Sequence, residues 1–159
     1  MNVGQLMTRS VQFCRPEDSL AAAAGAMWNH DIGCLPVVGA DGRVSGVITD
    51  RDICMAAYTQ GRALADLPVS VAMSRALYSC RPEDALIEAE QTMRSNQIRR
   101  LPVLEAEGNL VGVISVCDLA REAERENGRK GRQLTGQEVA ATIAAVVAPR
   151  ASVDLAPTL

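Results

Sequence analysis

The chain has 159 residues, of which 48% are hydrophobic and 22% are charged, a balance typical of a folded globular protein. Its net charge of −3 creates no general attraction to nucleic acid or to an anionic membrane, so we expect neither as a partner. The first residues lack the cationic start and apolar run of a secretory signal, and no apolar stretch is long enough to span a bilayer. We therefore expect a cytoplasmic protein.

The cysteines and the single histidine offer little for a metal site or for catalysis. The five cysteines are an odd number and include no Cys-x-x-Cys pair, so we expect neither a zinc site nor a disulfide framework. His30 falls at the end of an expected helix with no nucleophile beside it, and no pair of carboxylates stands out. The sequence therefore predicts no catalytic residue, no metal-binding residue and no obligatory cofactor.

An internal repeat organises most of the chain. Shifting the sequence by 66 positions places Cys-Arg-Pro-Glu-Asp at 14–18 on the same residues at 80–84, Leu-Pro-Val at 35–37 on 101–103, and Gly-Val-Ile at 46–48 on 112–114. Chance does not produce a match this long without a gap. We therefore interpret the chain as two copies of one unit of about fifty residues.

Each copy has the same expected elements in chain order. In the first copy, Leu20, Ala23 and Met27 fall at helical spacing, and the same stripe recurs at 86, 89 and 93. Apolar runs at 35–38 and 44–48 flank a turn rich in glycine and aspartate, as in a β-hairpin, and 105–109 forms the corresponding turn in the second copy. A further helix follows each hairpin, at about 50–58 and about 116–126.

Two such units make one folded body in this interpretation. A hairpin with two helices is too small to bury its own apolar faces, so we expect the copies to pack about a pseudo-twofold axis. The expected fold class is α+β, with tandem β-α-β-β-α repeats at 1–60 and 69–126, a linker at 61–68 and a tail at 127–159. A helix expected at 134–148 carries apolar Val139, Ile143, Val146 and Val147, which favour docking on the core or on another subunit.

Each hairpin leads into its helix through a seven-residue motif that begins with glycine. In the first copy the motif has Thr49 at its fourth position and ends with Asp52, and in the second copy Ser115 and Asp118 take these positions. Glycine lets a ligand approach the backbone, and a carboxylate can accept hydrogen bonds from both hydroxyls of a ribose. The hydroxyl and the free N–H groups of the first helical turn can donate to phosphate. The combination is typical of a nucleotide site.

The same residues have a second interpretation. Ser or Thr followed three residues later by an acid also caps a helix without any ligand. The recurrence of the motif at the same spacing in both copies favours a ligand. A cap and a ligand contact can coexist, because the hydroxyl and the carboxylate each have several hydrogen-bonding positions.

With doubled Leu-Pro-Val hairpins that end in Gly-Val-Ile-Thr/Ser-x-x-Asp, the chain resembles a cystathionine-β-synthase-type (CBS) domain pair, the Bateman module. The likeness covers residues 3–120 and is most specific at 30–37 with 46–53 and at 98–103 with 112–119. Since little else is attached, the chain is similar to stand-alone bacterial pairs, including the mycobacterial hypoxic response type. The resemblance implies a homodimer that binds AMP, ADP, ATP or a related adenosyl ligand, such as NAD or S-adenosylmethionine, and regulates an unidentified target protein in trans.

The resemblance also implies roles for individual residues. Thr49 with Asp52, and Ser115 with Asp118, are expected to hold the ribose and phosphate of the ligand in two sites. Apolar residues near the first strand and the hairpin are expected to sandwich the adenine. These are Val11, Ile32, Pro36, Leu77, Ile98 and Pro102.

The two copies differ in charge close to the motif. Arg99 and Arg100 in the second copy stand where the first has Gly33 and Cys34. A pair of guanidinium groups beside a nucleotide can bind phosphate bidentately; the alternative is a surface pair bonded to nearby carboxylates. Arg51 is open to the same two interpretations. If the arginines bind ligand, the two sites differ in their preference for phosphate.

Three classes of function follow, and the first is favoured. The chain is a regulatory module that changes shape or assembly when it binds an adenosyl ligand. Alternatively, it is a ligand-free dimerisation unit whose Thr/Ser-x-x-Asp motifs act only as helix caps. An enzyme is the third class, and the lack of a catalytic constellation argues against it.

Overall fold

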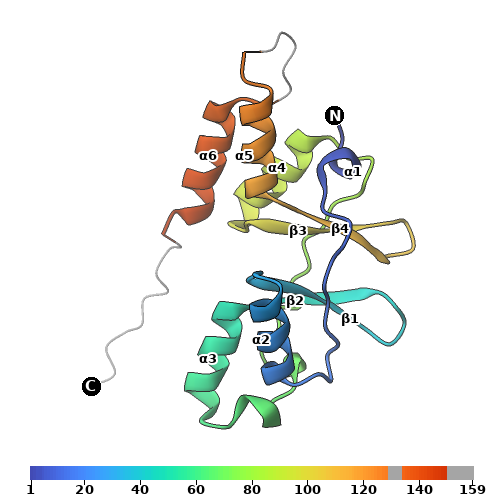
Figure 1. Ribbon diagram of the computed structural model, residues 1–159, viewed down its shortest axis with the longest axis vertical. Helices are drawn as coiled ribbons and strands as arrows, with labels where there is room; N and C mark the ends of the chain where they lie inside the picture. Colours follow the sequence, from blue (N-terminus) through green and yellow to red (C-terminus); the bar gives the residue numbers. More distant parts are fainter. Residues whose placement is uncertain (129–133, 150–159) are drawn as a thin grey trace.

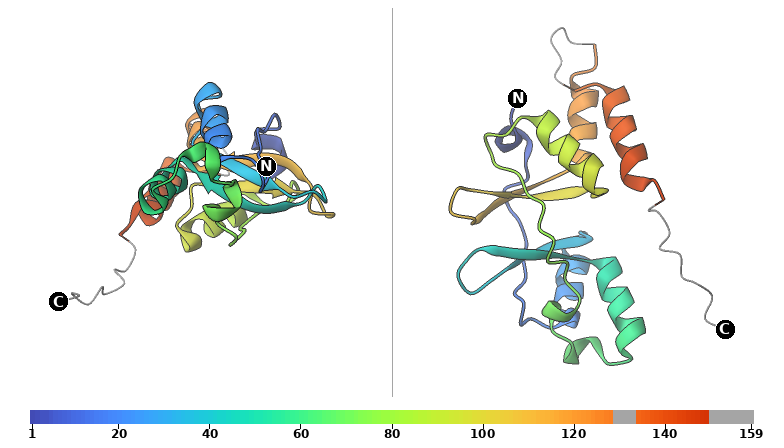
Figure 2. Two further views of the ribbon diagram at one scale, coloured as in Figure 1. Left: turned by 90° about the horizontal axis from the view of Figure 1, so that it is seen from below. Right: turned by 180° about the vertical axis from the view of Figure 1, so that it is seen from behind.

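The computed structural model describes residues 1–128 and 134–149, and its two repeats lie one above the other (Figure 1). The main helices of both repeats gather at one side of the molecule, and the hairpin turns point to the other, as the view from behind also shows (Figure 2). None of the helices in these residues is long and apolar enough to cross a membrane.

The two repeats contain the same elements in the same order. The first consists of α2 (Leu20–Asn29), β1 (Cys34–Val38), β2 (Val44–Thr49) and α3 (Asp50–Gln60). The second consists of α4 (Leu86–Asn96), β3 (Arg100–Leu104), β4 (Leu110–Ser115) and α5 (Val116–Arg125). Each hairpin is antiparallel and has a bulge at the equivalent position. The tandem β-α-β-β-α fold expected from the repeat is confirmed, although the first strand of each unit is reduced to a single parallel bridge, Cys14 to Val37 and Cys80 to Val103.

The repeats exchange the segments that precede their first helices. The N-terminal helix α1 (Val3–Leu6) and Thr8 pack on the second repeat, where Thr8 pairs with Val113 of β4. The segment between the repeats holds the short 3-10 turns η1 (Leu64–Asp66) and η2 (Val69–Val71) and packs on the first repeat, where Ser74 pairs with Val47 of β2. The two exchanges are equivalent under the 66-residue shift, so they interlock the repeats about the pseudo-twofold axis.

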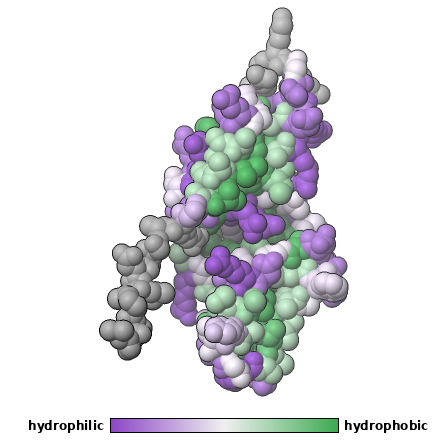
Figure 3. All heavy atoms as spheres, turned by 90° about the vertical axis from the view of Figure 1, so that its left-hand side faces the viewer, coloured by the Kyte–Doolittle hydropathy of each residue, from purple (hydrophilic) through white to green (hydrophobic). Residues whose placement is uncertain are grey.

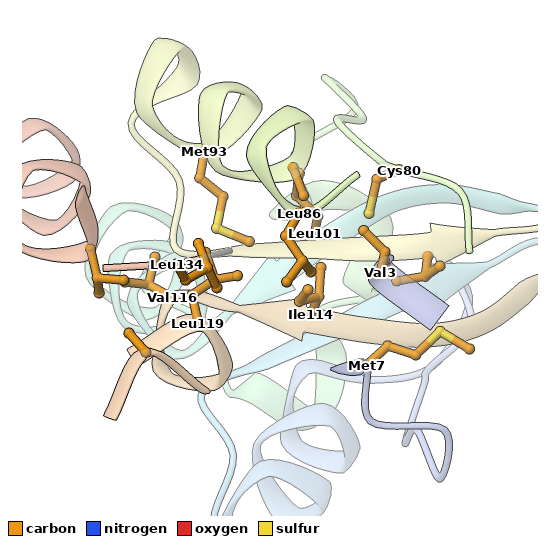
Figure 4. Close-up of a cluster of buried hydrophobic side chains, with 14 residues drawn as sticks. Val3, Met7, Cys80, Leu86, Met93, Leu101, Ile114, Val116, Leu119 and Leu134 are labelled. Atoms are coloured by element: carbon orange, nitrogen blue, oxygen red, sulfur yellow. The ribbon is translucent and has the colours of Figure 1, made fainter. Parts of the chain in front are cut away.

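Each repeat has its own hydrophobic core, to which the exchanged segment contributes. In the second repeat, Val3 and Met7 of the N-terminal segment are buried with Leu101 and Ile114 of the hairpin (Figure 4). In the first repeat, the equivalent residues are Val69, which is buried beside Leu67, and Met73, which packs against the same core. Neither sequence repeat is therefore a complete packing unit alone.

A final helix, α6 (Gly136–Val147), lies on α4 and α5 of the second repeat (Figure 1). Val139 is buried in the second core, and Val146 packs against it. Thr142 donates a hydrogen bond to the buried carboxylate of Glu90, and the Nε2 of Gln97 donates to the carbonyl of Ala148 at 3.0 Å. The helix therefore docks on the core of its own chain, and no helix of the described residues covers the first repeat in the same way.

Candidate ligand-binding site

The first candidate site is built at the point where β2 passes into α3. Thr49 is the N-cap residue of α3, and its Oγ1 accepts a hydrogen bond from the Asp52 N–H at 3.2 Å. The Asp52 Oδ2 accepts from both the N–H and the hydroxyl of Thr49, at 2.9 Å and 2.7 Å. The motif therefore forms a complete capping box, as the second interpretation of the sequence requires.

The second candidate site repeats this geometry where β4 passes into α5. The Asp118 Oδ2 accepts from the Ser115 N–H at 2.8 Å and from the Ser115 hydroxyl at 2.6 Å. Its other oxygen, Oδ1, accepts from the guanidinium of Arg121 at 3.0 Å. The residue equivalent to Arg121 in the first repeat is Met55, which carries no charge. Among the described residues, the Oδ1 of Asp52 has no hydrogen-bond partner, so it is free to accept from a ribose hydroxyl.

The glycine of each motif has a different role from the one expected. A Cβ built on Gly46 would collide with the carbonyl oxygen of Ser74 and lie 2.9 Å from the Cε of Met73. A Cβ on Gly112 would lie 2.5 Å from the Sδ of Met7. The close approach is therefore made by the exchanged segment of the other repeat, and the expectation that glycine admits a ligand at this point is wrong.

The free N–H groups expected at the start of α3 are also occupied. The Asp50 N–H donates to the Gly33 carbonyl at 3.3 Å, the Arg51 N–H to the Asp50 Oδ1 at 2.7 Å, and the Asp52 N–H to the Thr49 hydroxyl. A phosphate at this helix start must therefore be met by side chains rather than by the backbone donors that the sequence analysis expected.

Positive charge reaches the first site from the second repeat. Cys34 is the first residue of β1 and pairs with Thr49 across the hairpin. Burial raises the pKa of the Cys34 thiol to about 11, while Arg100 and Arg99 oppose that shift and Asp52 and Asp50 add to it. The thiol therefore lies in the field of two arginines of the second repeat and two aspartates of the first.

The arginine pair is available for a ligand. Arg99 is exposed and Arg100 is half-buried, and neither takes part in the ion pairs found among the described residues. The Arg99 backbone carbonyl accepts from the Val116 N–H at 3.0 Å, which fixes the pair at the start of α5. Arg51 is exposed at the start of α3 and its guanidinium likewise has no carboxylate partner in the described chain. The alternative in which these arginines bond to nearby carboxylates does not describe this structure.

The apolar candidates fall into two groups. Val11, Ile32, Leu77 and Ile98 are half-buried and border the hairpins from segments outside the strands. Two prolines, Pro36 and Pro102, are buried in the middle of β1 and β3, where their carbonyls accept from the N–H groups of Cys14 and Cys80 at 3.1 Å. The first group is accessible to a ligand in part, whereas the prolines are enclosed within the hairpins.

Three residues beside the motifs were given no role in the sequence analysis. Asp50 lies against Gly33, where a built Cβ would be 2.9 Å from its Oδ2, and Cys34 lies between the charges of the two repeats. Arg121 pairs with Asp118. The signal for all three was the difference between the two copies. Asp50 aligns with an apolar residue, Cys34 aligns with an arginine, and Arg121 aligns with Met55. No group of three or more His, Cys, Asp or Glu side chains in the described residues is placed to hold a metal ion.

Two interlocked β-α-β-β-α repeats, each with a hydroxyl and a carboxylate at the start of its last helix, define a tandem module of paired sites. A family model for the CBS domain matches residues 3–58 and 65–125. The chain belongs to the CBS domain family and contains the domain twice.

Known proteins resemble the chain over most of its length. The CBS domain-containing protein YhcV of Bacillus subtilis is 39% identical over 134 residues, which span 84% of this chain and 93% of that protein. Hypoxic response protein 1 of Mycobacterium tuberculosis is 33% identical over 116 residues, which span 73% and 80%. The crystal structure of CBSX2 in complex with AMP has the same fold, with a TM-score of 0.69 and 24% identity over 78% of this chain and 96% of that one. The resemblance to stand-alone pairs of the hypoxic response type is confirmed.

Proposed function

We propose that the chain is a regulatory module that binds an adenosyl ligand and acts in trans, as a homodimer in the cytoplasm, on a target protein. The observation that carries the proposal is the first site, where Asp52 has an unused carboxylate oxygen and Arg99 and Arg100 have no carboxylate partners. The charges of Arg99 and Arg100, at the start of α5, act on Cys34, which pairs with Thr49 at the start of α3, so the proposal assigns an acceptor for ribose and a donor pair for phosphate to one ligand. Membership of a family that includes a CBS pair solved with AMP supports this ligand class.

The proposed contacts in the first site follow from the groups that remain available. The Asp52 Oδ1 accepts from a ribose hydroxyl, while its Oδ2 stays in the capping box. Arg99 and Arg100 donate to phosphate oxygens, since charged forks of this kind bind phosphate more strongly than neutral donors do. Ile32 and Val11 contact the base. The cap and the ligand contact therefore coexist on different oxygens of one carboxylate.

The second site is proposed to bind more weakly. Its Asp118 Oδ1 already accepts from Arg121, so a ribose must displace or share that ion pair. Gly33 and Cys34 stand where the arginines would be, and they supply no positive charge for phosphate. Unequal sites let a module respond to two ranges of ligand concentration.

The competing function is that of a ligand-free dimerisation unit. Both capping boxes are complete without a ligand, which is the observation that favours it. Under this alternative, Asp52 and Asp118 contribute only to helix stability.

A thermal unfolding panel separates the two functions. We expect AMP, ADP, ATP, NAD or S-adenosylmethionine to raise the melting temperature, and GTP and UTP to do so weakly. A ligand at a hundred times its dissociation constant adds about 2.7 kcal/mol per site, which corresponds to several degrees for a chain of this length. If no adenine ligand raises the melting temperature at millimolar concentration, the dimerisation unit becomes the better description.

A further inference from the structure

The helices of the first repeat form an open groove. It has a volume of about 330 Å³ and lies between α2 and α3. Its lining is mostly apolar and comprises Ala24, Met27, Trp28, Asp31, Ile32, Gly33, Asp50 and Ile53. The Trp28 side chain, the only tryptophan of the chain, is 87% exposed, and Tyr58 on α3 is 84% exposed. Large aromatic side chains this exposed are typical of protein interfaces.

The equivalent groove of the second repeat is filled by α6. Shifting the lining residues by 66 gives positions on α4, on α5 and between them, and several of these contact α6 or the residues next to it. Met93 and Leu119, the equivalents of Met27 and Ile53, are buried in one cluster with Val139. Gln97, the equivalent of Asp31, donates to carbonyls at the end of α6. The fold therefore shows what this groove accepts, which is an apolar helix.

The outer face of α6 is apolar as well. No charged residue occurs between Glu138 and Pro149, and the face turned away from the core carries Ile143 and Val147, which are 43% and 66% exposed. A helix that is apolar all round is normally buried on all sides. Among the described residues, only one side of α6 is covered, by α4 and α5.

Both uncovered surfaces face the same way. The α6 helix and α3 lie on the same side of the molecule in Figure 1, and the view of that side shows apolar residues over both repeats with a hydrophilic band between them (Figure 3). A partner that approaches this side can therefore cover both surfaces together.

We propose that two copies of the chain assemble antiparallel, each placing the outer face of its α6 in the α2–α3 groove of the other. Each α6 is then held between the second repeat of its own chain and the first repeat of its partner. The contact occurs twice about a twofold axis and closes, so the assembly is a dimer and not a filament. This arrangement specifies the homodimer of the proposed function and does not depend on nucleotide binding.

The groove also adjoins the first ligand site. Ile32, Gly33 and Asp50 line the groove and flank the Asp52 motif. A partner helix in the groove therefore touches residues that also border the ligand, which gives a ligand a direct route to change assembly.

Two charge variants test the arrangement by light scattering. The wild-type chain is expected at twice its mass of 16.9 kDa, whereas Trp28→Glu and Ile143→Lys are each expected to be monomeric at the same concentration. In an equimolar mixture, the two variants can pair with each other. One contact of this mixed dimer joins the two substituted surfaces, which carry opposite charges, and the other contact is wild type, so we expect the dimer to return. If grooves pair with grooves and α6 with α6, both contacts in the mixture are damaged and the dimer does not return.

The single tryptophan gives a second, independent measurement. Burial of Trp28 by the partner shifts its fluorescence emission to shorter wavelength. We expect Ile143→Lys to abolish this shift, although Ile143 lies on α6 and Trp28 lies on α2. Val71→Lys, at a side chain 49% exposed outside both surfaces, serves as the matched control and should keep the wild-type mass and emission. A monomeric wild-type chain, a dimeric Ile143→Lys variant or a mixture that stays monomeric would each overturn the proposal.

Discussion

At the residue scale, the two candidate sites differ through single substitutions. Asp52 and Asp118 make the same capping contacts, but only Asp118 is also paired, with Arg121. The charges of Arg99 and Arg100 act on Cys34 beside the Asp52 motif, whereas the equivalent residues Gly33 and Cys34 carry no positive charge. Two sites related by a pseudo-twofold axis are therefore chemically unequal.

The arginine pair is predicted to act on phosphate and not on adenosine. Replacing both residues, Arg99→Ala with Arg100→Ala, should weaken AMP and ATP binding by about tenfold or more, because each lost charge-assisted hydrogen bond contributes about 1.5 to 3 kcal/mol. Adenosine should bind as it does to the wild type. Titration calorimetry measures both, with Arg43→Ala, at the far end of the hairpins, as the matched control. Equal losses for adenosine and AMP would contradict the assignment.

The cysteines illustrate how environment separates residues of one type. Burial raises the pKa of the Cys14 and Cys80 thiols to about 12, with smaller contributions from Asp18 and Asp84. Cys54 and Cys117 are exposed. The position of Cys14 and Cys80 beside the hairpins explains why burial applies to these two, since each donates its N–H to a proline carbonyl of the neighbouring strand.

At the scale of elements, the exchanged segments decide where glycine is required. Gly46→Ala is predicted to destabilise the chain by about 1 to 3 kcal/mol, because the new methyl group meets the backbone of Ser74. Gly112→Ala should cost less, since its nearest contact is the flexible side chain of Met7 and the backbone oxygen of Thr8 lies farther away, at 3.0 Å. Urea unfolding provides the measurement.

A helical glycine gives the matched control for this prediction. Gly25 in α2 has no atom within 4 Å of a built Cβ, so Gly25→Ala should stabilise the chain by up to about 1 kcal/mol through helix propensity. A Gly46→Ala variant as stable as Gly25→Ala would show that the segment over β2 is not packed as described.

The α6 helix is predicted to depend on its contact with Glu90. The carboxylate is 1% exposed, one oxygen accepts from Thr142, and the other has no partner among the described residues. Thr142→Val should therefore cost about 1 to 3 kcal/mol in the free energy of unfolding, because the carboxylate is left buried without any partner. The double variant Glu90→Leu with Thr142→Val should recover most of that loss. If Thr142→Val unfolds at the wild-type urea concentration, the contact contributes nothing.

The element scale also shows what sequence reasoning missed. The apolar stripe of 139–147 predicted docking on the core or on another subunit. The structure shows that one face of α6 docks on the core, whereas Ile143 and Val147 are exposed on another face. The sequence could not show that the segments before each first helix cross to the other repeat. Such a crossing depends on long-range packing of Val3 and Val69, which local periodicity does not record.

At the scale of the whole molecule, the 66-residue repeat was sufficient to predict the tandem fold. The hairpins, the helices and the twofold relation follow from local sequence patterns that occur in both copies. The sequence indicated two sets of phosphate donors, the first N–H groups of the last helix and the Arg99-Arg100 pair, and could not decide between them. At the start of α3 these N–H groups are occupied, so the arginines take on that role in the proposed function.

The proposed regulation also belongs to this scale. In the proposed function, a ligand held by Asp52 and the Arg99-Arg100 pair contacts both repeats, and a partner in the groove beside the first site relates two chains. Ligand binding can shift either equilibrium only by its difference in affinity for the two states. The adenosyl ligand itself is therefore the central claim.

Titration calorimetry of the chain with AMP tests that claim most directly. We expect saturable binding of AMP, little heat with GMP, and at least a tenfold loss of AMP affinity in Asp52→Asn. The melting temperature of the ligand-free variant should stay near wild type, because the asparagine oxygen can still accept from Thr49 in the capping box. The account would be contradicted if no adenine ligand bound saturably. It would also be contradicted if the Asp52→Asn variant lost stability yet bound AMP as the wild type does.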